Sequence, residues 1–125
     1  MLRVKKIFFA WFPVFLWMGL IFYLSSLPSL RITEGLSDLI LRKLAHITEY
    51  AILFFLFWRG LDQSGSFSKK KRLLAAFILT VLYAVTDEYH QTFVSGRSGA
   101  VRDVAIDTAG ALAGLILGFR FKFLK

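Results

Sequence analysis

Ionisable side chains interrupt three apolar runs of the sequence. His46 and Glu49 lie three residues apart in one run, Asp87 and His90 lie three apart in the next, and Asp107 lies in the last. Residues at i and i+3 share one face of an α-helix, so each pair presents an imidazole beside a carboxylate. Such pairs serve in general acid–base and nucleophilic catalysis, and the same groups ligate divalent metals. The spacing predicts a site for proton transfer or metal binding.

Three of these residues receive catalytic roles. We expect His46 to act as general base or nucleophile, with Glu49 orienting its ring and Asp87 as acid partner or second orienting group. The alternative is a divalent metal, and no other cofactor is indicated. The residues that would hold the metal are His46, Glu49, Asp87, His90 and Asp107.

Further polar residues in the same regions are predicted to bind a substrate head group. Arg97 lies in the glycine-flanked stretch SGRSG, and with Lys43 it suits capture of a phosphate or carboxylate. Tyr50 follows Glu49 and also suits packing or anchoring at the membrane interface. The remaining predicted contacts are Gln91, Glu88, Asp103 and Asp107.

The composition shows what kind of protein must hold these groups. The chain has 125 residues, of which 57% are hydrophobic and 17% aromatic, with a mean hydropathy of +0.62 and a net charge of +8. So many aromatic side chains exclude intrinsic disorder, and a soluble domain of this size needs more polar surface. We therefore predict a small integral membrane protein, whose positive charge sets its orientation rather than binding nucleic acid.

Four apolar runs are long enough to cross a membrane as helices. About 20 helical residues span an apolar layer of roughly 30 Å, so four spans nearly exhaust the chain. The sequence predicts an all-α, single-domain protein, residues 1–125, with a bundle of four transmembrane helices. Segment 31–43 lies along the membrane surface or begins the second helix, and Pro13 falls in the first turns of the first span. The predicted spans are residues 7–27, 44–61, 73–93 and 104–119, with a polar loop at 62–72.

The charges are distributed unevenly over the two sides. If the N-terminus is cytoplasmic, eleven of the sixteen basic side chains lie inside, and seven of the eight acids lie outside or in the outer half. This bias predicts that both termini are cytoplasmic. At 1.5 Å per residue, Glu49, Asp87 and Asp107 then lie about 7–9 Å below the outer surface. An acid at mid-membrane costs about 2.5–3.5 kcal/mol, so three acids at one depth indicate a functional site.

Glycines recur at every fourth position of the last span. Gly110, Gly114 and Gly118 share a helix face with Asp103 and Asp107. Small residues at this spacing form a seam for close helix packing. We expect the seam to press the two acids toward the neighbouring helices.

Three ordered motifs carry a family resemblance. They are Lys43-x-x-His46-x-x-Glu49-Tyr50, Asp87-Glu88-x-His90-Gln91-x-Phe93 with Gly96-Arg97, and Asp103-x-x-x-Asp107-x-x-Gly110-x-x-x-Gly114. With these motifs the chain resembles the VanZ-like family of small bacterial membrane proteins, in which many members have Asn at the position of Asp107. The family is named for a teicoplanin (glycopeptide) resistance accessory protein. The resemblance implies a helical protein of the bacterial cytoplasmic membrane that acts in the cell envelope.

Two functions of different classes fit the residues. The first is an enzyme whose outward-facing pocket binds and modifies the head group of a lipid-linked cell-wall precursor or a phospholipid. The second is a non-catalytic protein that binds a lipid or glycopeptide or modulates a partner membrane complex. A proton or ion relay is disfavoured because the inner halves of the spans are almost wholly apolar.

Overall fold

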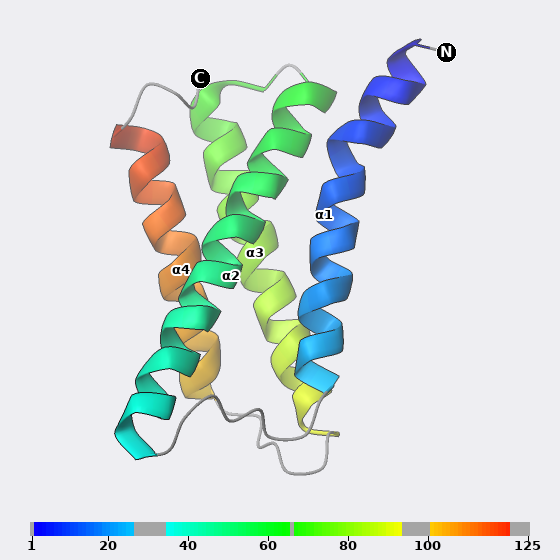
Figure 1. The fold of residues 1–125 in the computed structure, drawn as a ribbon. Coiled ribbons are helices and arrows are strands. Elements are labelled where there is room, and N and C mark those ends of the chain that lie inside the picture. Colours follow the sequence, from blue (N-terminus) through cyan, green and yellow to red (C-terminus); the bar gives the residue numbers. More distant parts are fainter. Residues whose placement is uncertain (1, 27–34, 66, 94–100, 121–125) are drawn as a thin grey trace.

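A computed structural model shows four helices in an antiparallel up-and-down bundle (Figure 1). The structure describes residues 2–26, 35–65, 67–93 and 101–120, with side chains throughout except at 35, 36, 38, 39 and 101–103. The all-α prediction with four helices is confirmed. The helices are α1 (Leu2–Ser26), α2 (Gly35–Ser64), α3 (Lys69–Gln91) and α4 (Val101–Arg120).

The helices extend further than the apolar runs that predicted them. Helix α2 has 30 residues and begins at Gly35, so of the two alternatives for segment 31–43, the one that begins the second helix agrees with the structure from Gly35 onward. The predicted polar loop at 62–72 is shorter, because its two ends are helical. Helix α3 begins where the hydroxyl of Ser68 accepts the Lys71 backbone N–H, so polar residues form its first turn.

The hydrophobic core lies between α1, α2 and α3, and α4 packs closely on α2 and α3. Tyr50, Leu53 and Phe54 on α2 are completely buried in it. A Cβ built on Gly110 would lie 2.4 Å from the carbonyl oxygen of Ile47, and one built on Gly114 would lie 2.5 Å from the Phe54 ring. The backbones of α4 and α2 are thus close enough that these positions require glycine, in agreement with the predicted glycine seam.

Helix α1 is fastened to α2 near a proline. Because α1 begins at Leu2 and not at residue 7, Pro13 lies well inside the helix and not in its first turns. A proline has no N–H, so the carbonyl of Phe9, four residues earlier, loses its donor within the helix. Arg59 Nη1 donates to this carbonyl at 3.2 Å and to that of Ala10 at 3.4 Å. Nearby, Trp11 Nε1 donates to Ser64 Oγ at 2.6 Å.

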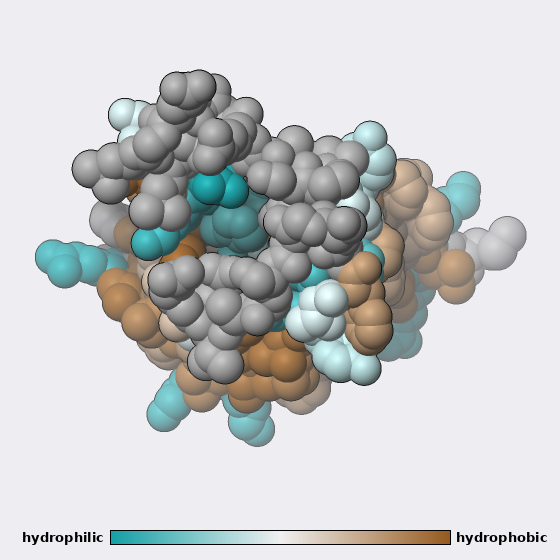
Figure 2. Space-filling model, turned by 90° about the horizontal axis from the view of Figure 1, so that it is seen from below, coloured by the Kyte–Doolittle hydropathy of each residue, from teal (hydrophilic) through white to brown (hydrophobic). Residues whose placement is uncertain are grey.

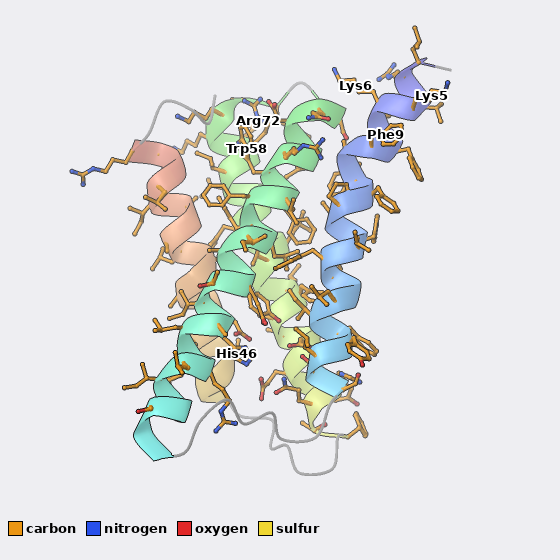
Figure 3. All side chains as sticks on the ribbon, viewed as in Figure 1. Lys5, Lys6, Phe9, His46, Trp58 and Arg72 are labelled. Carbon is orange, nitrogen blue, oxygen red and sulfur yellow. The ribbon has the colours of Figure 1, made fainter. Side chains whose placement is uncertain are left out.

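The outside of the bundle is apolar along its length and charged at its ends. Large hydrophobic side chains such as Phe12, Phe15 and Leu16 are exposed on α1, and α1 and α3 are long and apolar enough to cross a membrane. The start of α1 and the junction of α2 and α3 lie at one end, where Figure 3 shows Lys5, Lys6 and Arg72. His46 lies toward the opposite end (Figure 3). We call that opposite end, formed by the start of α2, the end of α3 and the start of α4, the polar end.

Candidate functional site

The polar end holds a carboxylate–imidazole pair that joins α2 to α4. His46 Nδ1 donates to Asp107 Oδ1 at 3.0 Å, with Asp107 almost completely buried and His46 30% exposed. Gly110, one turn after Asp107, contacts the backbone of Ile47, the residue after His46. The absence of a side chain at Gly110 therefore brings the two helices together at the level of the pair.

A second hydrogen bond joins α2 to α3. Tyr50, one turn after His46, donates its hydroxyl proton to Asp87 Oδ2 at 3.0 Å, and both side chains are buried. Helix α2 thus contacts an acid on each neighbour, through His46 on one side and Tyr50 on the other.

The two pairs form one electrostatic cluster. The charges of Asp107, Glu49 and Asp87 all act on the His46 ring, and those of Asp87 and Asp107 both act on the Tyr50 hydroxyl. Carboxylates from three helices therefore act on the imidazole, and two of them also act on the phenol. The convergence of Glu49, Asp87 and Asp107, predicted from their similar depth, agrees with this arrangement.

The roles within the cluster differ from those predicted. The partner that accepts a hydrogen bond from His46 is Asp107, not Glu49, which contributes its charge from the same helix. Asp87 pairs with Tyr50 rather than directly with His46. The hydrogen bonds of His46 and Asp87 therefore run between helices, and Glu49 acts on the His46 ring from the same helix.

Further polar residues lie on the last turns of α3. Asp87, Glu88 and Gln91 are all buried, and the ring of His90 stacks on Phe22 of α1 with ring centroids 4.0 Å apart. Adjacent acids on a helix point in different directions, yet Glu88 is buried like its neighbour. Figure 2, which views the molecule from the polar end, shows hydrophilic surface recessed in the middle of this face and hydrophobic surface along the side.

Two of the predicted substrate-binding side chains lie outside the part of the chain that the structure describes. Arg97 lies outside the described residues, and the side chain of Asp103, in the first turn of α4, is not described. Lys43 is described and partly buried on α2.

The proposed metal ligands are not assembled into one site. Within the described part of the chain, no three His, Asp or Glu side chains are arranged to hold a metal ion. His46 is bound to Asp107, Asp87 is bound to Tyr50, and His90 packs against α1.

Two contacts were not foreseen from the sequence. Tyr50 was assigned to packing as well as to binding, and its hydrogen bond to Asp87 gives it a more specific place. Its position one turn after His46 places it on the same helix face, but no spacing indicates Asp87 as its partner. Trp17 Nε1 donates to the backbone carbonyl of Glu49 at 2.9 Å and holds α1 against the turn that carries the cluster. No spacing in the sequence indicated this contact.

The fold and the site together define the class of protein. It is a small bundle of four helices with an apolar exterior, two helices fit to cross a membrane and a cluster of carboxylates around an imidazole at one end. The profile of the VanZ/LLP1 family matches residues 8–122, and the chain belongs to this family. Family membership and the two apolar helices indicate a membrane protein. Comparison with curated proteins and with solved structures found no significant match.

Proposed function

We propose that the protein crosses the bacterial cytoplasmic membrane four times, with both termini in the cytoplasm and the polar end facing outward. The separation of charge in the fold supports this orientation. Lys5, Lys6, Arg72 and the C-terminal end of α4 lie at one end of the bundle, and the carboxylates around His46 lie toward the other. Basic residues favour the cytoplasmic side.

We further propose that the cluster is a catalytic centre that binds and modifies the head group of a membrane amphiphile, a lipid-linked cell-wall precursor or a phospholipid. The observation that carries this proposal is the His46–Asp107 pair. A carboxylate that accepts from Nδ1 fixes the ring so that Nε2 carries the lone pair. Nε2 then removes a proton from a hydroxyl group or a water molecule as its oxygen attacks the head group. The bond to the displaced group breaks, and the imidazolium returns the proton to the oxygen of that leaving group.

The remaining acids support the same chemistry. When Nε2 accepts a proton the ring becomes an imidazolium, and the charges of Asp107, Glu49 and Asp87 stabilise it. The acyl chains of the amphiphile lie along the apolar exterior, and its head group reaches the polar end. Modification of an envelope lipid would link this site to the glycopeptide-resistance context of the family name.

The test compares the lipids of bacteria that express the wild-type protein or one of three variants. His46→Asn removes the base, and Asp107→Asn keeps an oxygen that accepts from Nδ1 but removes the charge. Thr48→Val is the matched control, because Thr48 is exposed on the same helix and bonds only its own helix turn, at the carbonyl of Leu44. Extracts are analysed by mass spectrometry, and teicoplanin susceptibility is measured in parallel.

We expect a change in one head-group class that is present with wild type and Thr48→Val and absent with His46→Asn. With Asp107→Asn the change should be reduced by about 10²-fold or more, as when the orienting acid of a catalytic histidine is lost. If His46→Asn, at equal expression, produces the same lipids and the same susceptibility as wild type, the site is not catalytic. The non-catalytic binding function would then replace it.

A further inference from the structure

The last turns of α3 carry three polar atoms that are buried without a partner. Asp87 Oδ1, His90 Nδ1 and Gln91 Nε2 have almost no accessible surface, and no atom in the part of the chain that the structure describes hydrogen-bonds to them. The side chains of Asp87 and Gln91 are only 2% and 3% exposed. Buried polar groups in proteins are nearly always hydrogen-bonded, so three exceptions on adjacent turns indicate a binding site.

The three atoms belong to one side of α3. Asp87 and Gln91 are four residues apart and His90 lies between them, three residues after Asp87, so all three share a helix face. Two neighbouring contacts hold them in place. Tyr50 binds the other oxygen of Asp87, and Phe22 stacks on the His90 ring. The free atoms of Asp87 and His90 are thus carried by side chains whose other contacts fix their position, and the side chain of Gln91 is buried beside them.

The chemistry of the three atoms defines what they bind. Asp87 Oδ1 accepts a hydrogen bond, Gln91 Nε2 donates one, and His90 Nδ1 does either, according to which ring nitrogen carries the proton. A hydroxyl group both donates and accepts, so two neighbouring hydroxyls match this set. A phosphate group offers only acceptors and would meet the charge of Asp87, with Glu88 buried beside it.

We propose that Asp87, His90 and Gln91 form a subsite for the neighbouring hydroxyl groups of a neutral head-group moiety, either a sugar or a glycerol. This proposal deepens the proposed function, and rests on it, because Asp87 is common to the subsite and to the cluster around His46. It places the hydroxyl-bearing part of the head group next to the cluster that carries the base.

The experiment measures the affinity of purified protein in detergent for three lipids with identical acyl chains. Phosphatidylglycerol carries a phosphate and a diol, glucosyl diacylglycerol carries a diol without a phosphate, and phosphatidic acid carries a phosphate without a diol. The variants are His90→Phe, which keeps an aromatic ring to stack on Phe22, and Gln91→Leu. Tyr89→Phe is the matched control, since Tyr89 lies on the same turn and is 69% exposed.

We expect wild-type protein and Tyr89→Phe to bind at least one of the two diol lipids about tenfold more tightly than phosphatidic acid, as expected for one or two additional hydrogen bonds. Preference for the glucosyl lipid identifies a sugar head group, and preference for phosphatidylglycerol identifies glycerol. His90→Phe and Gln91→Leu should each remove most of the preference.

Equal or tighter binding of phosphatidic acid by the wild-type protein would overturn the proposal, whether or not the variants fold. Unchanged preference in folded His90→Phe and Gln91→Leu would overturn it as well, and would leave only water at these atoms. His46→Asn separates the two proposals, because it should abolish lipid modification and keep the diol preference. Modification without diol preference refutes the subsite alone, and diol preference without modification refutes the catalytic role alone.

Discussion

Replacing Gly110 by alanine tests whether the close contact of α4 with α2 holds the His46–Asp107 pair together. The added Cβ would lie 2.4 Å from the carbonyl oxygen of Ile47 and 3.2 Å from the backbone nitrogen of Ala51. Neither atom can rotate away, because both belong to the backbone of α2. Restoring an ordinary contact requires the helices to separate by about 1 Å. The hydrogen bond, now 3.0 Å long, would then exceed the length at which it stabilises.

The expected loss of stability follows from three contributions. Overpacking costs about 1–3 kcal/mol, and the loss of a hydrogen bond to a charged group costs about 1.5–3 kcal/mol. Replacing a helical glycine by alanine returns about 0.5–1 kcal/mol. We therefore expect Gly110→Ala to destabilise the protein by about 1.5–5.5 kcal/mol.

The assay is thermal unfolding in detergent, followed by tryptophan fluorescence, together with the ¹⁵N chemical shifts of the His46 ring. Gly19→Ala is the matched control, because a Cβ at Gly19 would meet nothing within 4 Å, and it should be neutral or gain up to about 1 kcal/mol. If Gly110→Ala unfolds at the wild-type temperature with unchanged His46 shifts, close packing does not hold the pair.

Two other contacts make predictions of the same kind. Arg59→Leu should destabilise the protein by about 1–3 kcal/mol because it leaves the Phe9 carbonyl without a donor, and the loss should be smaller in a Pro13→Ala background, where the helix supplies its own donor. Equal losses in both backgrounds, measured by thermal unfolding, would contradict this account. Tyr50→Phe should cost about 1–3 kcal/mol because it leaves both oxygens of the buried Asp87 carboxylate without a described partner. Wild-type stability of this variant in chemical denaturation would show that the hydrogen bond does not stabilise the fold.

The apolar runs predicted the helices but not their ends. Apolar runs mark the buried part of a helix, whereas the start of α2 mixes polar and apolar residues and the first turn of α3 is polar. The chain remains helical at Lys69 because Ser68 caps the helix. The place of Pro13 was wrong for the same reason, since α1 begins at Leu2, among basic residues that the apolar run excluded.

The sequence indicated that polar residues of three helices lie at a similar depth, but not which of them are hydrogen-bonded to one another. Spacing along one helix tells which residues share a face, so it favoured Glu49 as the partner of His46. The observed pairing depends on the rotation of α4 against α2, and Gly110 sets that contact. The glycine seam was predicted, but the sequence did not indicate that its close packing brings Asp107 to the His46 ring. Asp107 was assigned to substrate binding, whereas the structure places it on His46.

At the polar end, some buried polar atoms have no hydrogen-bond partner among the described residues, unlike those of a purely structural network. A network that only holds helices together stabilises them best when every buried polar atom has a partner. Here each of the two cross-helix hydrogen bonds fixes one oxygen of an acid, and Asp87 retains a second, buried oxygen beside the unpaired atoms of His90 and Gln91. At the opposite end Arg59 binds the carbonyl that Pro13 frees, and among the described side-chain nitrogens of Arg59, Trp11 and Trp58 a single buried one, Trp58 Nε1, lacks a hydrogen-bond partner. Three unpaired polar atoms on adjacent turns, next to an imidazole oriented by a carboxylate, are better explained by a ligand than by the stability of the bundle.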